Sequence, residues 1–565
     1  SLGNTDATQH LFRGEYVFPP THDSYTRDFL CEAVRIRQEI ETLPQTSCEL
    51  TTEEFLTFWN TANERISSSK SGRHFGHYKA ICSDARLVAL QVHSINLATS
   101  KSLPLTRWGQ GVTVLLEKVA GTARIDKLRA ICLLEADFNW WLRVIFAHRM
   151  IQKMKLAGAI PLEQGAVKGK TTTNNSLLKQ LFFDQANILH EDCAISSTDA
   201  ENCYDAVNHA ACSIALQAMG VFVEFVQCHL YCVQIMQYYL ATGHGLAISS
   251  YGGTPESICM GLVQGSGAAP GAWIAVSTVI VGAYKRRGYG AHLVGGWSQT
   301  QIPLAALLYV DDTDLLHKQE PSLSSQDTLV PWVQEATNHW AHLLQATGGN
   351  LKPAKCYWYL LQYRFVRGIA SLASKAQLSH HFLSIPQPDG SQVSLDLKDP
   401  TEASNVLGVL ASPTGDGEPM LHHMLSKGYK WSNRVLKSRL LPNDAWFSLK
   451  TQAIMSVRYG LITLMASRTS INSKLSRWYY HCLPALGVNR SIGHEWRMLP
   501  FKFQGLGLPN LTLEKLSESL HLLQYHWSHN TDLGQALQLS FELVQVETGL
   551  YGNFLLRDYS TFECL

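Results

Sequence analysis

The stretch from Leu304 to Lys318 constrains the fold most, because two apolar runs flank the adjacent carboxylates Asp311 and Asp312. Each run is short and bulky enough for a buried strand, so we expect a hairpin with Tyr309 close to its tip. Two buried acids side by side repel each other unless they are paired or bind a metal ion. Mg²⁺ often uses one or two protein carboxylates and completes its coordination with water and substrate phosphates. The stretch therefore indicates a nucleotidyl-transfer site, with an ordinary charged turn as the alternative.

Composition bounds the class of protein but does not decide it. The chain has 565 residues, 45% of them hydrophobic, with 47 Lys and Arg against 46 Asp and Glu, so nucleic-acid binding would depend on local basic patches. The 13 cysteines form no CxxC pair, which favours a reducing compartment. The longest apolar run, Ala272 to Tyr284, is too short to span a bilayer, so we expect no membrane association and an intracellular location. Because the first residue is Ser1, we expect a fragment with neighbouring domains missing.

The first third of the chain predicts helices followed by a basic hairpin. Residues 1 to 105 have apolar residues at helical spacing and predict a helical extension. A basic loop at 67–79 either contacts phosphate or is simply solvated. Residues 112–134 predict an antiparallel hairpin carrying Lys118 and Arg129, placed to hold a triphosphate if the hairpin folds over the acidic site. Lys168 and Lys170 lie in a segment without the spacing of a P-loop, which leaves a basic turn for a nucleic-acid backbone.

Two further segments carry candidate site residues. A β-like run ends in Asp199, which is either a metal ligand or a helix N-cap. Tyr204 follows five residues later, where its ring would crowd the 2′-hydroxyl of a ribonucleotide and admit a deoxyribonucleotide. Gln264 and Gly265 belong to a Gly-rich loop before the apolar helix that starts near Pro270, which suits packing against a base pair or is a common structural loop.

The remaining segments predict a helix over 324–347, a short strand and long C-terminal helices. The helix stops at a Gly pair and is followed by a segment containing Lys355. Asn405 to Val409 predicts a strand in which Gly408 allows backbones to come close. Beyond Leu421 we expect long helices, for instance from Ala445 to Ala466, with a basic face formed by Lys427, Lys430, Arg434, Lys437 and Arg439.

The order of these motifs resembles the reverse transcriptases, most closely those of non-LTR retrotransposons, over residues 67–510. The matching segments are the YxDD hairpin Tyr309-Val310-Asp311-Asp312, the first palm motif with Asp199 and Tyr204-Asp205, the Gln264-Gly265-Ser266 loop, the fingers segment Arg129 to Leu133 with Lys118 before it, Gly349-Asn350-Leu351 with Lys355, the primer-grip strand with Leu407 and Gly408, and Gly505-Leu506-Gly507. The chain departs from the family where prolines are usual, at Ala130, Val263 and Gly267, and is one residue short near Gln164.

The resemblance implies an α+β right-hand polymerase with a helical N-terminal extension (1–105), fingers (106–190), an antiparallel-sheet palm (191–415) and a helical thumb with C-terminal region (416–565). It implies that Asp199, Asp311 and Asp312 bind two Mg²⁺ ions, with Mn²⁺ as a substitute, and that Lys355 protonates pyrophosphate. Lys118, Arg129, Tyr204, Gln264 and Gly265 would contact the nucleotide, and Lys168, Lys170, Leu407 and Gly408 the nucleic acid.

The implied partners are an RNA template, a DNA or RNA primer and deoxyribonucleoside triphosphates. Further domains or a structured RNA outside this chain are expected to contribute, and the location would be nuclear for a eukaryotic element. Two alternatives stay open on the residues alone. An RNA-dependent RNA polymerase uses the same palm, although Tyr204 disfavours it, and a polymerase-derived scaffold would lack activity, although retention of the acids disfavours that.

Overall fold

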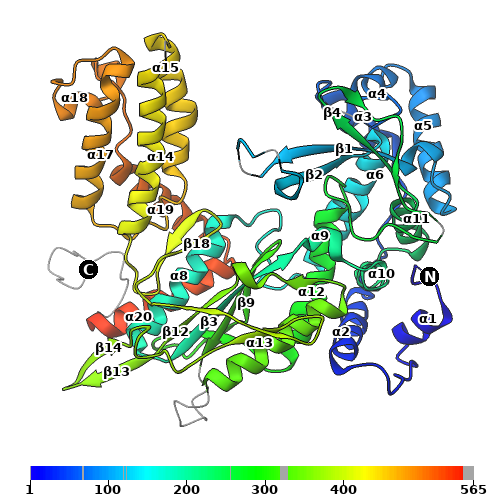
Figure 1. Ribbon diagram of the computed structural model, residues 1–565, viewed down its shortest axis with the longest axis horizontal. Coiled ribbons are helices and arrows are strands. Elements are labelled where there is room, and N and C mark those ends of the chain that lie inside the picture. Colours follow the sequence, from blue (N-terminus) through cyan, green and yellow to red (C-terminus); the bar gives the residue numbers. More distant parts are fainter. Residues whose placement is uncertain are drawn as a thin grey trace.

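The computed structural model describes residues 2–66, 69–118, 120–122, 124–254, 256–318, 329–438 and 440–550. About half of the chain is helical and 16% is strand, so the predicted mixed α+β class is confirmed. In Figure 1 a central sheet with helices on its faces carries two further groups of elements, one helical and one mixed, that rise from it on opposite sides. Within the described residues no helix is long and apolar enough to cross a membrane.

The central sheet has the strand order β17-β12-β3-β10-β9, and β11 adds to the end of β3. Its pairings are antiparallel except that of β12 with β17, which is parallel. The strands are β3 (Cys193–Glu201), β9 (Ala306–Tyr309), β10 (Asp312–Lys318), β11 (Asn350–Leu351), β12 (Tyr357–Leu361) and β17 (Asp396–Lys398).

The predicted hairpin over 304–318 forms, with one difference in its first half. Asp312 pairs with Tyr309, so Val310 and Asp311 make a two-residue turn, and Val310 has the positive φ of 62° that such turns use. The first apolar run is split, because Leu304 belongs to β8 (Gln301–Leu304), which pairs with β7 (Ala291–Val294) outside the central sheet. The hairpin strand begins only at Ala306.

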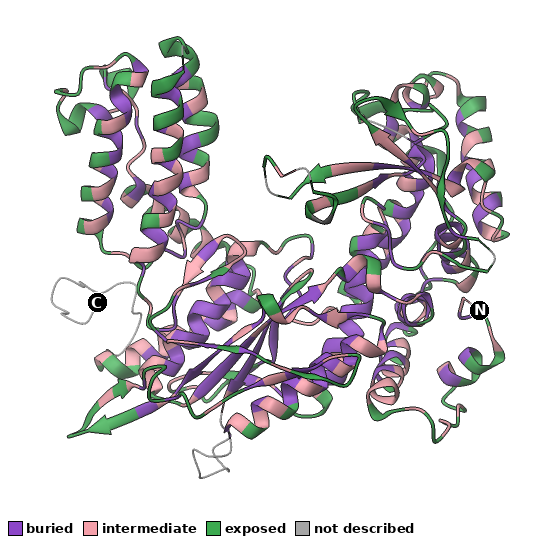
Figure 2. Ribbon diagram, in the orientation of Figure 1, coloured by how far each residue is buried: buried purple, intermediate pink, exposed green. Residues whose placement is uncertain are grey.

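Alternating residues of the central strands belong to two different cores. Most of this sheet is coloured as buried in Figure 2. Ala194 and Trp358 belong to the core under α2 (Ser24–Ile40), α10 (His209–Ala218), α12 (Ala269–Arg286) and α13 (Leu329–Ala346). Ile195 and Tyr359, their neighbours in sequence, belong to the core under α8 (Thr172–Leu189) and α20 (Asp532–Thr548). The near-continuous apolar character of these strands follows from this burial on both faces.

The N-terminal residues are helical as predicted, but they do not form a separate unit, because α2 packs on α10, α12 and α13. Beside them, the predicted hairpin over 112–134 forms from β1 and β2, and β1 also pairs in parallel with β4, a strand more than 100 residues later. The elements here are α1 (Asp6–Phe12), α3 (Thr52–Thr61), α4 (Phe75–Ile81), α5 (Ala85–Ser100), η1 (Thr106–Gly109), β1 (Gln110–Glu117), η2 (Ile125–Lys127), β2 (Leu128–Leu133), α6 (Ala136–Leu142), η3 (Arg143–Arg149), α7 (Met150–Leu156), α9 (Cys203–Ala206), α11 (Val223–Gln234), β4 (Gln237–Thr242), β5 (Gly245–Leu246) and β6 (Tyr251–Gly252).

The C-terminal third forms a helical group with its own core, but its last helix leaves that group. Residues between Val409 and Leu511 share one core, whereas α20 packs on α8 beneath the central sheet. The expected helix from Ala445 to Ala466 is wrong in its second half, because it ends at Arg458 before Gly460, whose φ is 81°. The remaining elements are η5 (Pro353–Lys355), β13 (Tyr363–Val366), β14 (Ile369–Leu372), β15 (Ser384–Pro386), β16 (Gln392–Ser394), β18 (Ser404–Val406), β19 (Val409–Ala411), α14 (Glu418–Lys437), α15 (Pro442–Ser448), η6 (Leu449–Ala453), α16 (Ile454–Arg458), α17 (Arg468–Cys482), η7 (Leu483–Leu486), α18 (His494–Met498), η8 (Phe501–Phe503) and α19 (Leu511–Ser528).

Candidate active site

Three carboxylates meet at one end of the paired strands β3 and β10. Asp312 lies directly opposite Asp199 in the register, and the backbone N–H of Ala200 donates to the carbonyl of Asp311 at 3.0 Å. Asp199 is buried, whereas Asp311 and Asp312 are exposed. The expectation that both tip acids are buried is therefore wrong: they lie at the turn, where strand pairing ends and water has access. Strand β3 also continues to Glu201, two residues beyond Asp199.

The acids influence one another electrostatically. Partial desolvation, together with the charges of Asp311, Asp199 and Asp314, raises the pKa of Asp312 to about 6, and Lys355 opposes the shift. A raised carboxyl pKa means that the ionised form is disfavoured by its surroundings. A cation at this point would relieve the repulsion.

Lys355 lies beside the most buried of these acids. Its Nζ is 2.6 Å from Oδ2 of Asp199, and this hydrogen bond is the main reason that the pKa of Lys355 is raised. Pairing of β11 with the end of β3 positions the lysine, and the N–H of Lys352 donates to the Asp199 carbonyl at 2.9 Å. The structure therefore brings together the lysine and the acids that the sequence analysis singled out.

The carboxylates form an open donor set. Across the residues that the structure describes, no group of three or more His, Cys, Asp or Glu side chains is arranged to hold a metal ion. One carboxylate oxygen of Asp199 accepts a hydrogen bond from Lys355, and Asp311 and Asp312 are exposed to solvent. All the donors are carboxylate oxygens, which fits a hard divalent ion that keeps several waters and takes further ligands from substrate.

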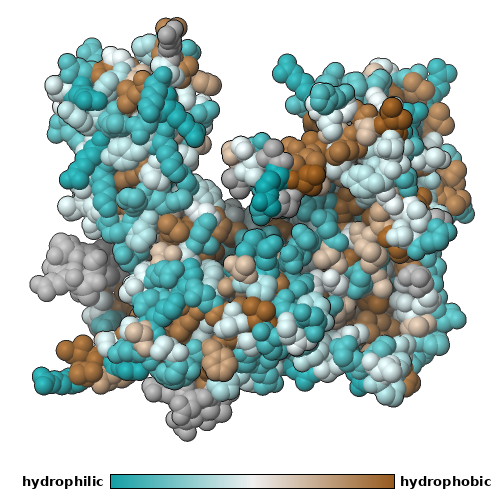
Figure 3. Space-filling model, in the orientation of Figure 1, coloured by the Kyte–Doolittle hydropathy of each residue, from teal (hydrophilic) through white to brown (hydrophobic). Residues whose placement is uncertain are grey.

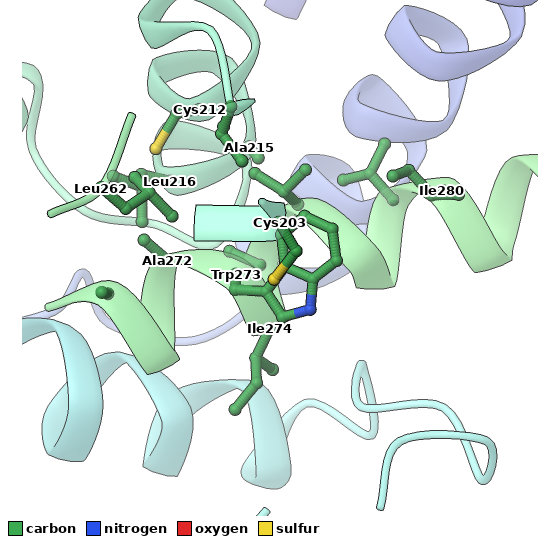
Figure 4. Packing of buried hydrophobic residues seen from close by; sticks show 14 of the residues in the cluster. Cys203, Cys212, Ala215, Leu216, Leu262, Ala272, Trp273, Ile274 and Ile280 are labelled. Carbon is green, nitrogen blue, oxygen red and sulfur yellow. The ribbon is translucent and has the colours of Figure 1, made fainter. Parts of the chain in front are cut away.

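The hairpin tip is held from behind by hydrogen bonds to its backbone. The indole N–H of Trp273 donates to the Val310 carbonyl at 2.7 Å, and Figure 4 shows Trp273 in the buried cluster that also contains Cys203. The Leu308 carbonyl accepts from the Gly165 N–H at 2.9 Å and from Nδ2 of Asn175 at 3.0 Å. These contacts fix the height of the turn relative to α12 and α8.

The turn after Gly165 carries the two predicted basic residues Lys168 and Lys170. Lys168 is exposed, as a residue that binds a nucleic-acid backbone would have to be. Lys170 is half-buried, donates to the Leu162 carbonyl at 2.8 Å and lies 3.5 Å from Asp532 of α20. Of the two predicted nucleic-acid contacts, Lys168 is therefore the more exposed.

The Gly-rich loop lies between the Tyr204-Asp205 segment and the hairpin of β1 and β2, and it forms hydrogen bonds with both. The N–H of Leu262 donates to the Tyr204 carbonyl at 2.6 Å, and Nε2 of Gln264 donates to Asp205 Oδ2 at 3.1 Å. Burial raises the pKa of Asp205, while Gln264 and the charge of Lys118 oppose this rise. Lys118, directly after β1, thus lies close enough for its charge to lower the pKa of Asp205. The sequence analysis named Asp205 only as part of a motif.

The same loop contacts strand β2 directly. The N–H of Cys132 donates to the Gln264 carbonyl at 2.8 Å. Gly265 has a φ of 109°, and a Cβ there would lie 2.2 Å from the Cys132 carbonyl oxygen, so only glycine fits. Arg129 is exposed on β2, opposite Leu116 of β1.

The predicted strand at Asn405 to Val409 is instead a tight hairpin turn. Leu407 and Gly408 have φ values of 51° and 84° and connect β18 to β19. The Tyr459 hydroxyl donates to the Leu407 carbonyl. A small cavity of about 30 Å³ lies between this turn and Asp312, so the turn still borders the acidic site.

Beneath the acids, Lys179 and Asp314 form a buried ion pair. The sequence analysis did not predict this pair. The Lys179 Nζ is 2.9 Å from Asp314 Oδ2, and the side chains are only 1% and 7% exposed. Asp314 lies two residues after Asp312 and thus on the same face of β10. Lys179 lies four residues after Asn175 on α8, so both helix residues meet the hairpin from one side.

The two predicted basic surfaces, at 67–79 and on α14, differ in whether their basic side chains contact other side chains or line a hollow. In the 67–79 segment, of which Ser67 and Ser68 lie outside the described residues, Lys70 lies 3.5 Å from the ring centroid of Tyr239 and Lys79 is 3.4 Å from Glu64. On α14, a hollow of about 420 Å³ is lined by Lys427, Lys430 and Arg434. Arg439 lies outside the described residues. The visible surface of this helical group is largely hydrophilic in Figure 3.

No protein-family model matches this chain, and no curated protein is significantly similar to it in sequence.

Proposed function

We propose that this chain is an RNA-directed DNA polymerase that extends a primer on an RNA template. The observation that carries the proposal is the register of β3 and β10, which sets Asp199 opposite Asp312 with Lys355 on Asp199. Acids on adjacent strands, a neighbouring lysine and open access to solvent suit a reaction in which a triphosphate enters between them.

In this proposal the central sheet with α12 and α13 is the palm. The sheet formed by β1, β2 and β4 is the fingers, and the helical group from α14 to α18 is the thumb. Three features support this division: the acids lie on the central sheet, the fingers hairpin is attached to the Gln264 loop, and the helical group has its own core. The N-terminal helices act as a buttress, because α2 packs on the palm helices.

Asp199, Asp311 and Asp312 would hold two Mg²⁺ ions, or Mn²⁺ in their place. Bound there, the ions would activate the primer 3′-hydroxyl and neutralise charge on the triphosphate. The raised pKa of Asp312 supports this assignment, since such a cluster of like charges favours cation binding.

The protein's own side chains supply proton transfer and electrostatic stabilisation. Lys355 donates a proton to the leaving pyrophosphate, as its protonated state beside Asp199 allows. Lys118 and Arg129 stabilise negative charge on the triphosphate. Gln264 and Gly265 support the nucleotide from the loop, and the Tyr204 ring excludes ribonucleotides at the sugar.

The test is extension of a DNA primer on an RNA template with Mg²⁺, with deoxyribonucleotides and ribonucleotides supplied in separate reactions. We expect extension with deoxyribonucleotides only, and no extension by the Asp311→Asn variant. Extension with ribonucleotides would favour an RNA-dependent RNA polymerase instead. Absence of extension with either, together with retained binding of the primer–template, would indicate a polymerase-derived scaffold.

A further inference from the structure

A hollow of about 270 Å³ lies between α2, α12 and the segment that follows α7. Its lining residues differ from those of the acidic site and of the cavity beside the Leu407 turn. The charged part of the lining consists of three cations and one acid, namely Arg35, Lys285, Arg286 and Glu32. A water takes up about 30 Å³ in the liquid and ligand pockets begin at about 300 Å³, so the hollow has the size for a small ligand.

Glu32 is the acid against which both guanidinium groups lie. Its side chain is 1% exposed, and its two oxygens lie 2.5 Å from Nη2 of Arg35 and 2.6 Å from Nε of Arg286. The close approach of Glu32 to α12 depends on Gly282, where a Cβ would lie 2.1 Å from Glu32 Oε1. One buried carboxylate therefore holds two guanidinium groups beside the hollow, while 40% of the Arg35 side chain and 45% of the Arg286 side chain stay exposed.

The lining carries more positive charge than its own acid neutralises. Lys285 binds the buried Glu163 at 2.9 Å, which leaves the two guanidinium groups to share Glu32. Arg35 also binds Glu39, but that acid is 47% exposed and lies outside the lining, so water screens its charge. A guanidinium has five N–H donors and an ammonium three, so these side chains keep donors for a further acceptor. The hollow therefore favours an anion.

Thr278 adds an unpartnered hydroxyl to the same lining. It lies one turn before Gly282 on α12 and is 2% exposed. A Ser or Thr within a helix commonly donates to the carbonyl one turn earlier, and the neighbouring Ser277 does so to Trp273 at 2.7 Å. Among the residues that the structure describes, none forms a hydrogen bond with the buried Oγ1 of Thr278. Because buried polar groups are nearly always hydrogen-bonded, this hydroxyl indicates a ligand that enters the hollow.

We propose that this hollow binds a phosphate group, carried by inorganic phosphate or by a phosphate monoester. Guanidinium groups match the oxygens of phosphate in a bidentate geometry, and the Lys285 ammonium adds a point charge. The Thr278 hydroxyl donates to the same anion from α12. A carboxylate has only two oxygens, whereas the several oxygens of a phosphate can accept from all four side chains.

The first test is isothermal titration of the full chain with inorganic phosphate, in a chloride buffer of low ionic strength that contains EDTA. We expect saturable binding of one phosphate per chain. Thr278→Val keeps the shape of the side chain and removes the hydroxyl, so we expect binding to weaken about tenfold or more, while the thermal midpoint of unfolding stays the same or rises. Absence of saturable binding by the unmodified chain, or binding that Thr278→Val leaves unchanged, overturns the proposal.

Arg286 and Arg287 provide a matched pair of variants. Arg286 lines the hollow, whereas Arg287 binds Asp28 at 2.8 Å outside it, and their side chains are 45% and 47% exposed. A change to Lys keeps the charge at either position and removes the bidentate fork. We expect Arg286→Lys to weaken phosphate binding about tenfold or more and Arg287→Lys to leave it unchanged. Equal weakening by both variants would show attraction to general surface charge and would rule out the hollow as the site.

The source of the phosphate group is tested with ribose 5-phosphate and with a 5′-phosphorylated oligonucleotide beside its unphosphorylated counterpart. Tighter binding of ribose 5-phosphate assigns the hollow to small phosphorylated compounds. Tighter binding of the oligonucleotide, lost without the 5′-phosphate and in Thr278→Val, assigns it to a nucleic-acid end. Because EDTA removes divalent ions and no synthesis is measured, these outcomes do not depend on the proposed polymerase function.

Discussion

The ammonium of Lys355 lies 2.6 Å from the Asp199 carboxylate, which makes the lysine a competitor for the same oxygen that a metal ion would use. Loss of this lysine should therefore have opposite effects on metal binding and on turnover. We expect Lys355→Met to bind Mg²⁺ more tightly, because a competing cation is removed. We also expect a fall in kcat of about 100-fold or more, because the proton donor is lost. Isothermal titration with Mg²⁺ and single-turnover extension would measure the two effects, and tighter binding with unchanged turnover would refute the proton-donor role.

Asp311 at the turn should be essential for synthesis and dispensable for folding. Asp311→Asn removes one metal-binding charge from an exposed position, so we expect extension to fall by roughly 1,000-fold, equivalent to several kcal/mol of transition-state stabilisation. The free energy of unfolding should change little, because the side chain is exposed. Substantial remaining synthesis would exclude Asp311 as a metal ligand.

Asp312 should make stability depend on pH in the absence of metal. Its pKa rises from 3.8 to about 6 on folding, so ionisation destabilises the native state. The destabilisation by ionised Asp312 is absent below about pH 4 and complete above about pH 6. We expect the stability of Asp312→Asn relative to the unmodified chain to increase as the pH rises through that window, as measured by urea unfolding in EDTA. A difference that does not vary with pH would show that Asp312 titrates normally.

The buried Lys179–Asp314 pair should be costly to break from one side. Lys179→Met leaves Asp314 as an uncompensated buried charge, and we expect a loss of about 3 to 5 kcal/mol in the free energy of unfolding. The double variant Lys179→Met with Asp314→Leu removes both charges and should recover most of that loss. Urea unfolding of the single and double variants measures the coupling, and equal losses in both would mean that the pair does not act as a unit.

Tyr204 should control the choice of sugar. Tyr204→Val shortens the side chain while the backbone bond from Leu262 stays, so the loop is expected to keep its position. We expect ribonucleotide incorporation to rise about tenfold or more relative to deoxyribonucleotide incorporation. Competition between the two nucleotide types in one reaction measures the ratio, and an unchanged ratio would assign the selectivity to another residue.

The sequence by itself predicted those features that depend on neighbouring residues. The hairpin with Asp311 and Asp312 at its tip, the strand that carries Asp199 and the helix beginning near Pro270 follow from apolar periodicity and turn chemistry. These patterns act over a few residues, so they are readable without knowledge of the rest of the fold. The prediction of a strand through Leu407 was wrong, because a glycine inside an apolar run is compatible with either a strand or a tight hairpin turn.

Only the tertiary structure decided which distant segments meet. The parallel pairing of β1 with β4, the packing of α20 on α8 and the pairing of Lys179 with Asp314 join residues more than 100 positions apart. The exposure of Asp311 and Asp312 likewise depends on what surrounds the hairpin. Such contacts arise from many weak interactions that are satisfied together, whereas a local pattern specifies only which face of each element is apolar.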